Sequence, residues 1–227
     1  MSGADAPPIR DAATVLLLRR DLGEPAVLMG QRGSAAAFMP DKYVFPGGAL
    51  DPGDHTVPLA CDLDLACQSR LDLHSPQGLG TALAASAVRE LWEETGLILG
   101  TRGDWPLPPP EDWKDFAATG HRPTAEGLRF IFRAITPPGR PRRFDARFFM
   151  ADAARLIGDP DDFSRASDEL SHLHWVPLST ARALNLPFIT EVVLGEVAAL
   201  LTHMGPPPEG VPFFDNSGAT PQFRRLI

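Results

Sequence analysis

A short acidic segment, RELWEETGL at positions 89–97, holds the side chains best suited to chemistry. On a helix, Glu90, Glu93 and Glu94 stand at i, i+3 and i+4, so their carboxylates share one face. Like charges at this spacing repel, and Gly96 is placed to end the helix, where the helix dipole also disfavours negative charge. One interpretation is a solvated acidic face. The other is a cation site, and oxygen ligands without nearby His or Cys favour Mg²⁺ or Mn²⁺ over zinc.

The rest of the sequence predicts the elements that would carry this helix. Apolar runs bounded by turn residues predict strands, the first two joined by a hairpin turn around 21–25. The predicted strands cover 12–20, 26–32, 43–48, 128–136, 142–151 and the start of 172–186. The predicted helices cover 59–73, 80–95 and 189–204. Thr81 is expected to cap the second helix, and a Pro-rich tail over 205–227 to wrap the surface. This order favours an α/β fold with a mixed sheet between helical layers.

Composition limits the class of protein. The 227 residues are 44% hydrophobic, which suits a single domain over 1–227. A formal net charge of −8 argues against nucleic acid or an anionic membrane as a partner. Cys61 and Cys67 form no metal-ligand pattern and are expected to be free thiols. The apolar run Val15–Leu18 is too short to span a membrane and precedes arginines instead of a cleavage site, so we expect a cytoplasmic protein.

The acidic segment resembles the second half of the Nudix box at every specified position. Upstream, VFPGGALDPGD resembles the first half, with Gly48 followed by Asp54 in place of the usual Glu. In this chain 34 residues separate Asp54 from Arg89, where the family has seven, so an insertion over about 55–79 splits the box. The resemblance implies a Nudix-type α/β/α sandwich and a metal-dependent hydrolase of a pyrophosphate linkage.

The resemblance also implies roles for the charged residues. Glu90 and Glu94 would bind Mg²⁺ or Mn²⁺ directly, Glu93 would bind metal or hold metal-bound water, and Arg89 would orient a glutamate. A main-chain carbonyl at Gly48 would join the metal shell, or the glycine would simply form a tight turn.

Other acidic and aromatic positions have weaker assignments. Asp54 would support the site or sit in the DPGD turn, and the turn is slightly preferred. Nudix enzymes commonly add an acid from a later loop, for which Glu169 is the first candidate and Glu126 the second. His172 and His174 are expected to have packing or surface roles.

The segment VLMGQRGSAAAFMPDKYVFPGG is similar to the subgroup that includes the acyl-CoA diphosphatases. This similarity implies CoA or acyl-CoA as the small-molecule substrate, with Arg32 and Lys42 near its 3′-phosphate and Phe45 as a further contact. Pro108–Pro110 stand near the spacing of ADP-ribose enzymes, which makes ADP-ribose or another nucleotide sugar the alternative substrate. A non-catalytic, nucleotide-binding regulatory domain is the alternative of another class. The insertion is expected to form a lid over the pocket or to extend a homodimer contact.

Overall fold

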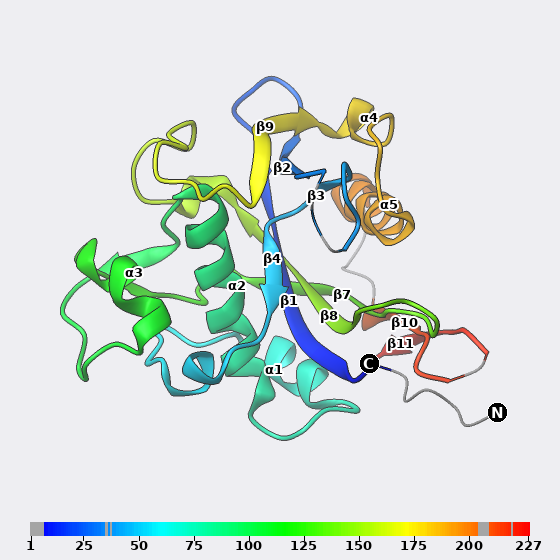
Figure 1. Ribbon diagram of the computed structural model, residues 1–227, viewed down its shortest axis with the longest axis horizontal. Helices are drawn as coiled ribbons and strands as arrows, with labels where there is room; N and C mark the ends of the chain where they lie inside the picture. The colour runs from blue at the N-terminus through cyan, green and yellow to red at the C-terminus, as the bar shows by residue number, and fades with distance from the viewer. Residues whose placement is uncertain (1–6, 35, 37, 204–208, 219) are drawn as a thin grey trace.

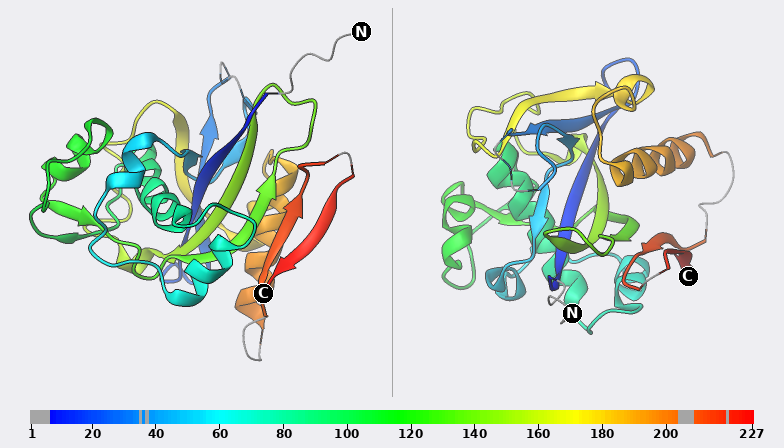
Figure 2. Two further views of the ribbon diagram at one scale, coloured as in Figure 1. Left: turned by 90° about the horizontal axis from the view of Figure 1, so that it is seen from below. Right: turned by 45° about the vertical axis from the view of Figure 1, so that its right-hand side comes forward.

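A nine-stranded mixed sheet forms the centre of the protein, and the computed structural model shows helices on both of its faces (Figures 1 and 2). The structure describes residues 7–34, 36, 38–203, 209–218 and 220–227. The strands of this sheet are β1 (Ile9–Arg19), β2 (Ala26–Arg32), β3 (Tyr43–Val44), β4 (Gly47–Ala49), β7 (Arg129–Ile135), β8 (Arg143–Asp152), β9 (Leu170–Pro177), β10 (Val211–Asp215) and β11 (Gln222–Leu226). A separate hairpin pairs β5 (Gly100–Arg102) with β6 (His121–Pro123). These strands confirm the predicted mixed sheet.

Helices cover the two faces of the sheet. The α-helices are α1 (Leu65–Asp72), α2 (Leu79–Thr95), α3 (Lys114–Ala118), α4 (Leu178–Ala181) and α5 (Phe188–Thr202). Short 3₁₀ turns are η1 (Pro52–Thr56), η2 (Glu111–Trp113) and η3 (Ala153–Arg155). Figure 2 shows α1 and α2 on one side of the sheet and α5 on the other. Within the described part of the chain, no helix has the length and apolar character that a membrane crossing requires.

Strand β1 explains how one sheet separates the two helical layers. Its run is buried on both faces: Val15 and Leu17 pack into the core that contains α2, while Leu16 and Leu18 pack into the core that contains α5. The sheet order is β11-β10-β7-β8-β1-β2-β3, with β4 added to β1 and β9 to β2. This arrangement is the predicted α/β/α sandwich.

The sheet forks where β1 changes its partner. Near its end β1 pairs with β2, through Leu18 and Val27, and in its first half it pairs with β4, through Thr14 and Gly47. On its other edge β1 runs parallel to β8 along most of its length. The two glycines of β4 therefore lie at the fork, next to α2 (Figure 1).

The insertion packs into the main core. Its residues Leu63, Cys67 and Leu71 are buried in the cluster that contains α2. The predicted helix over 59–73 is too long, because Asp64 accepts a hydrogen bond from the Cys67 amide (2.8 Å) and so starts α1 at Leu65. Both cysteines are free, as predicted.

A buried charge network ties the insertion to the sheet. Arg133 of β7 forms an ion pair with Asp145 of β8 (2.6 Å) and donates to the backbone carbonyls of Leu73 (3.0 Å) and His74 (3.1 Å). Arg147 of β8, also paired with Asp145, donates to the Ser75 hydroxyl (2.9 Å). The end of the insertion is thus held against β7 and β8.

Two local predictions are wrong. Thr81 does not cap α2, because the helix begins two residues earlier, at Leu79, after Gly78 turns in the left-handed region (φ 79°). The tail over 205–227 does not merely wrap the surface: β10 pairs with β7 and β11 pairs with β10. Residues 204–208 and 219 of the predicted helix and tail lie outside the described residues.

Candidate active site

Helix α2 places the three glutamates of the acidic segment. Its Ala-rich first half is buried, and it ends at Gly96 (φ 74°), whose amide donates to the Trp92 carbonyl (2.8 Å). Glu94 is 2% exposed and Glu90 is 9% exposed, while the Glu93 side chain remains 39% exposed. We refer to Glu90 and Glu94 as the acidic pair. The predicted helix and its terminal glycine are confirmed.

The glycines of β4 fit closely against the acidic pair. The Gly47 amide donates to Glu94 Oε2 (2.8 Å). A Cβ atom at Gly48 would lie 2.4 Å from Glu90 Oε1, and one at Gly47 would lie 2.6 Å from the Ala13 carbonyl oxygen. Neither position has room for a side chain, so the backbone can approach both carboxylates directly.

Burial gives the acidic pair unusual protonation. It raises the pKa of Glu90 to about 7, against the lowering effect of the Arg89 guanidinium. Burial together with the nearby Glu90 charge raises the pKa of Glu94 well above its usual value, while Arg32 acts in the opposite direction. Burial thus makes the charged form of both carboxylates costly, and a bound cation would offset that cost. Their all-oxygen chemistry fits a divalent cation such as Mg²⁺ or Mn²⁺.

Arg89 joins the two halves of the split box. Its Nε donates to Asp54 Oδ1 (2.9 Å) and its Nη2 to Asp54 Oδ2 (3.0 Å). Its Nη1 lies 3.0 Å from Glu93 Oε2 and 2.9 Å from Glu90 Oε1. The arginine is 3% exposed, so these contacts hold its position on the acidic face. The bidentate pair shows that Asp54 lies at the site despite the long insertion.

Asp54 has further partners that fix it. The Asp51 amide donates to Asp54 Oδ2 (2.9 Å), so Asp54 also stabilises its own turn, η1, as the sequence suggested. The indole Nε1 of Trp113, in η2, donates to Asp54 Oδ1 (3.0 Å), and this tryptophan is fully buried. The sequence gave no sign of this contact, because Trp113 lies in a Pro-rich segment distant from the box.

The later acids lie in different places. Glu169, before β9, is exposed and close enough for its charge to raise the pKa values of Glu90 and Glu94. Glu126 instead forms an ion pair with Arg155 (3.3 Å) and does not line the groove described below. Among the described residues, no three His, Cys, Asp or Glu side chains are grouped so as to hold a metal ion. Glu90 and Glu93 each contact Arg89, and these contacts agree with the absence of three converging acidic side chains in the described residues.

A groove of about 1110 Å³ opens from Glu90 and Glu93 across the α5 face of the sheet, and the buried Glu94 does not line it. We call it the groove; among the residues that line it are Arg10, Arg32, Lys42, Phe45, Gly48, Glu90, Glu93, Arg142, Phe144, Phe148 and Glu169. None of the described residues of the insertion lines the groove, so the expected lid over the pocket is wrong. The insertion packs on the opposite, α2 face because its leucines belong to that core.

The three predicted substrate contacts differ in their availability. Phe45 is 3% exposed and packs in the α5-side core. Lys42 Nζ donates to Asn185 Oδ1 (2.6 Å) and to the Leu186 carbonyl (3.1 Å), so its charge is already engaged. Arg32 has a buried Nε without a hydrogen-bond partner among the described residues. Of the three, Arg32 has the most capacity for a new ligand.

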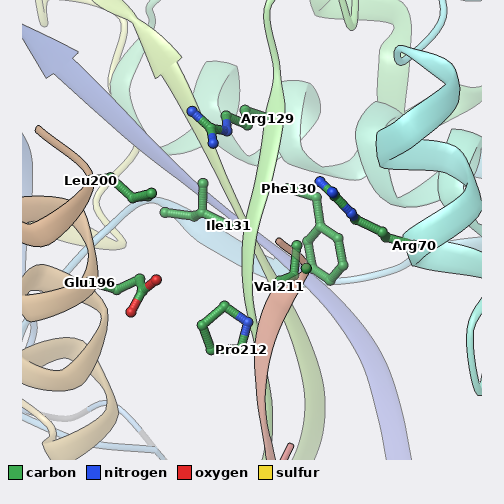
Figure 3. Close-up of a pocket in the computed structure, with 9 residues that line it drawn as sticks. Arg70, Arg129, Phe130, Ile131, Glu196, Leu200, Val211 and Pro212 are labelled. Atoms are coloured by element: carbon green, nitrogen blue, oxygen red, sulfur yellow. The ribbon is translucent and has the colours of Figure 1, made fainter. Parts of the chain in front are cut away.

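Other residues singled out in the sequence have packing or surface positions. His172 and His174 are exposed on β9, and His174 Nδ1 lies 2.7 Å from the His172 carbonyl oxygen. Neither histidine lines the groove. Figure 3 shows a second crevice, between β7, α5 and β10, lined by side chains that include Arg129 and Glu196. Its volume of about 20 Å³ is room for about one water molecule, and it lies apart from the acidic pair.

Comparisons with known proteins show which proteins this arrangement resembles. No family model matches the chain. Nudix hydrolase 7 of Caenorhabditis elegans is 28% identical over 179 residues, which cover 74% of this chain and 51% of that protein. This chain therefore spans about half the length of the curated relative it matches.

Solved structures agree with that relative. A NUDIX hydrolase from Alicyclobacillus acidocaldarius is 29% identical, covers 88% of this chain and 99% of its own, and has a TM-score of 0.65. The NUDIX domain of Shewanella oneidensis NrtR, crystallised with ADP ribose, is 13% identical, covers 86% of this chain and 90% of its own, and has a TM-score of 0.50, so it supports the fold alone. The comparisons support the prediction of a Nudix pyrophosphohydrolase. By its fold, its helical box and these similarities, the chain resembles Nudix hydrolases.

Proposed function

We propose that this protein hydrolyses the pyrophosphate linkage of a nucleoside diphosphate derivative, with CoA or acyl-CoA as the substrate. The observation that carries the proposal is the acidic pair, buried against Gly47 and Gly48, of which Glu90 lines a groove of about 1110 Å³. A groove of this size suits a ligand larger than a simple nucleotide.

The acidic residues and Arg89 would have different roles in hydrolysis. A divalent cation supplies neutralisation of the diphosphate charge and a lowered pKa for bound water. Glu90 and Glu94 would hold this cation, and Arg89 fixes the positions of Glu93 and Glu90 through the ion pairs described above. Glu169, exposed and also lining the groove, would supply the further carboxylate expected at this metal site.

The groove favours CoA derivatives over the alternative substrate. Its wall includes Phe144, Phe148 and Phe214, which offer an apolar surface to a long substituent. Pro108–Pro110, the sequence feature that suggested ADP-ribose, do not line the groove. A substrate with an extended apolar arm uses this surface better than a second sugar does.

The function is tested by a product-resolved screen with Mg²⁺ and Mn²⁺ against CoA, acyl-CoAs, ADP-ribose, NADH and nucleoside triphosphates. Glu94→Gln is nearly isosteric and removes one carboxylate charge, so we expect turnover to fall at least about a hundredfold while the fold survives. Wild-type turnover in this variant would remove Glu94 from the metal site. Metal-dependent binding without product release would instead favour the regulatory class.

A homodimer is a further part of the proposal. Strand β11 lies at the edge of the sheet, and Phe223 on it is 62% exposed. Edge strands with apolar side chains favour pairing with another strand. Light scattering after size exclusion should give twice the chain mass, and a monomer mass at micromolar concentration would contradict this assembly.

A further inference from the structure

Arginines line the part of the groove beside the loop between β7 and β8. We propose that the arginines there, Arg140 and Arg142 with Arg10 beside them, bind a second anionic group of the substrate, separate from its diphosphate. All three line the groove. The inference rests on the proposed function, because it takes the diphosphate to lie at the acidic pair.

The sheet register gives the spacing between the two ends. Gly48, at the acidic pair, pairs with Ala13 of β1, and Ala13 pairs with Arg147 of β8. Arg10 lies three residues before Ala13, about 10 Å away at the rise of a strand. Arg142 lies five residues before Arg147, about 17 Å away on the same scale. Arg142 is therefore displaced along the sheet from the diphosphate position, but it lies within the reach of one extended substrate. Arg10 lies between the two positions, since its partner Asp51 is 3.6 Å from Arg89.

The charge of the two loop arginines, Arg140 and Arg142, is available, whereas Arg10 Nη2 lies 3.9 Å from Asp51 Oδ1. Arg133 and Arg147, on the adjoining strands, are buried and form ion pairs with Asp145. Arg140 and Arg142 are exposed, and neither forms an ion pair with a described residue. The protein has a formal net charge of −8, yet the guanidinium groups of Arg140 and Arg142 have no acidic partner among the described residues at the rim of the groove. This arrangement favours an anionic ligand.

The loop and the groove floor suit such a ligand. Pro137 and Pro141 flank Arg140 and restrict the loop that carries the arginines. Between the two ends, the floor is apolar, with Ala146 and Phe144 on the face of β8 that lines the groove. The structure thus orders diphosphate, apolar contact and second anion along one line. The second anion could be a phosphate on the ribose or a carboxylate at the far end of an acyl group.

The test removes the two loop charges and compares ligands that differ by one anionic group. Arg140→Gln/Arg142→Gln is matched by Arg102→Gln/Arg182→Gln, which removes two exposed arginine charges outside the groove. Calorimetry with adenosine 3′,5′-bisphosphate against AMP measures ribose-phosphate recognition without any hydrolysis. Steady-state kinetics with CoA against dephospho-CoA, and with glutaryl-CoA against butyryl-CoA, measure recognition of the ribose phosphate and of the acyl carboxylate.

We expect the wild type to prefer the more anionic member of one pair, and the loop variant to lose at least about tenfold of that preference, the effect of one charge-assisted contact. A loss in the ribose-phosphate pairs identifies a ribose phosphate, and a loss in the acyl pair identifies a carboxylate. Unchanged preferences in every pair, or an equal loss in the matched variant, would overturn the inference. If the wild type hydrolyses none of these compounds, the proposed function fails, while the bisphosphate comparison still tests the arginines.

Discussion

Trp113→Phe is expected to weaken the metal site from a distance. The substitution keeps an aromatic ring in the core but removes the Nε1 donor that lies 3.0 Å from Asp54 Oδ1. A hydrogen bond to a charged group contributes about 1.5–3 kcal/mol, and Asp54 has no exposed surface through which water could replace it. Asp54 holds Arg89, and Arg89 contacts two of the glutamates. Part of the free energy lost with this hydrogen bond should therefore appear as weaker binding of the metal.

Trp105→Phe is the matched control for this change. Trp105 packs against Trp113, with ring centroids 5.9 Å apart, and its Nε1 donates to the His121 carbonyl (2.8 Å) instead of a carboxylate. A neutral hydrogen bond contributes about 0.5–1.5 kcal/mol, so the two variants should differ by about 1–2 kcal/mol in the free energy of unfolding.

Two measurements separate positioning from simple destabilisation. Urea denaturation gives the free energy of unfolding, and titration with Mn²⁺, followed by paramagnetic resonance, gives the dissociation constant of the metal. If about 1 kcal/mol of the lost free energy weakens metal binding by the glutamates, Trp113→Phe should raise the Mn²⁺ dissociation constant about fivefold. Trp105→Phe should change this constant little. Equal metal affinities in the two variants would refute the reasoning, because Trp113 would then support only the core.

Three other outcomes follow from contacts in the same region. Gly48→Ala should lower turnover at least about a hundredfold, since its Cβ would lie 2.4 Å from Glu90 Oε1, whereas Gly33→Ala, with nothing within 4 Å, should leave kcat unchanged. The metal-free protein should lose about 3 kcal/mol of stability as pH rises from about 4.5 through 7. The reason is that the pKa of Glu90 is raised to about 7, so the folded protein holds this proton more tightly than the unfolded chain does. Thermal scans should show that Mn²⁺ reduces this loss. Leu71→Ala should cost about 2–5 kcal/mol in urea denaturation without changing relative activity among substrates, and Leu65→Ala, 81% exposed, should cost less than about 0.5 kcal/mol.

The sequence predicted the parts of the fold that depend on local pattern. Helix α2 and its end at Gly96 follow from residues within two or three turns of one another. The strands β1 and β8 were predicted from short apolar runs, which remain apolar because both faces are buried. Strands β10 and β11 were missed because Pro and Gly dominate their surroundings, and only pairing with β7 gives this segment its conformation.

The site was predicted in part. The contact between Asp54 and Arg89 was suggested by the resemblance, although the two residues stand 35 positions apart. The indole of Trp113 and the arginines of the β7–β8 loop carried no signal, because their positions depend on how distant segments meet. The insertion was misplaced for the same reason: its leucines indicated that it needs a surface, but not which face of the sheet supplies it.

The split box has a consequence for how this site can change over evolution. Because Asp54 and Arg89 are joined by two direct hydrogen bonds, the length of chain between them enters only as the entropy of closing a loop. Lengthening that loop from seven residues to 34 costs about 1.4 kcal/mol for a flexible chain, less than the bidentate contact returns. The segment after Asp54 is thus a site where insertions are tolerated. New sequence there can be selected for its packing while Asp54 and Arg89 keep their geometry.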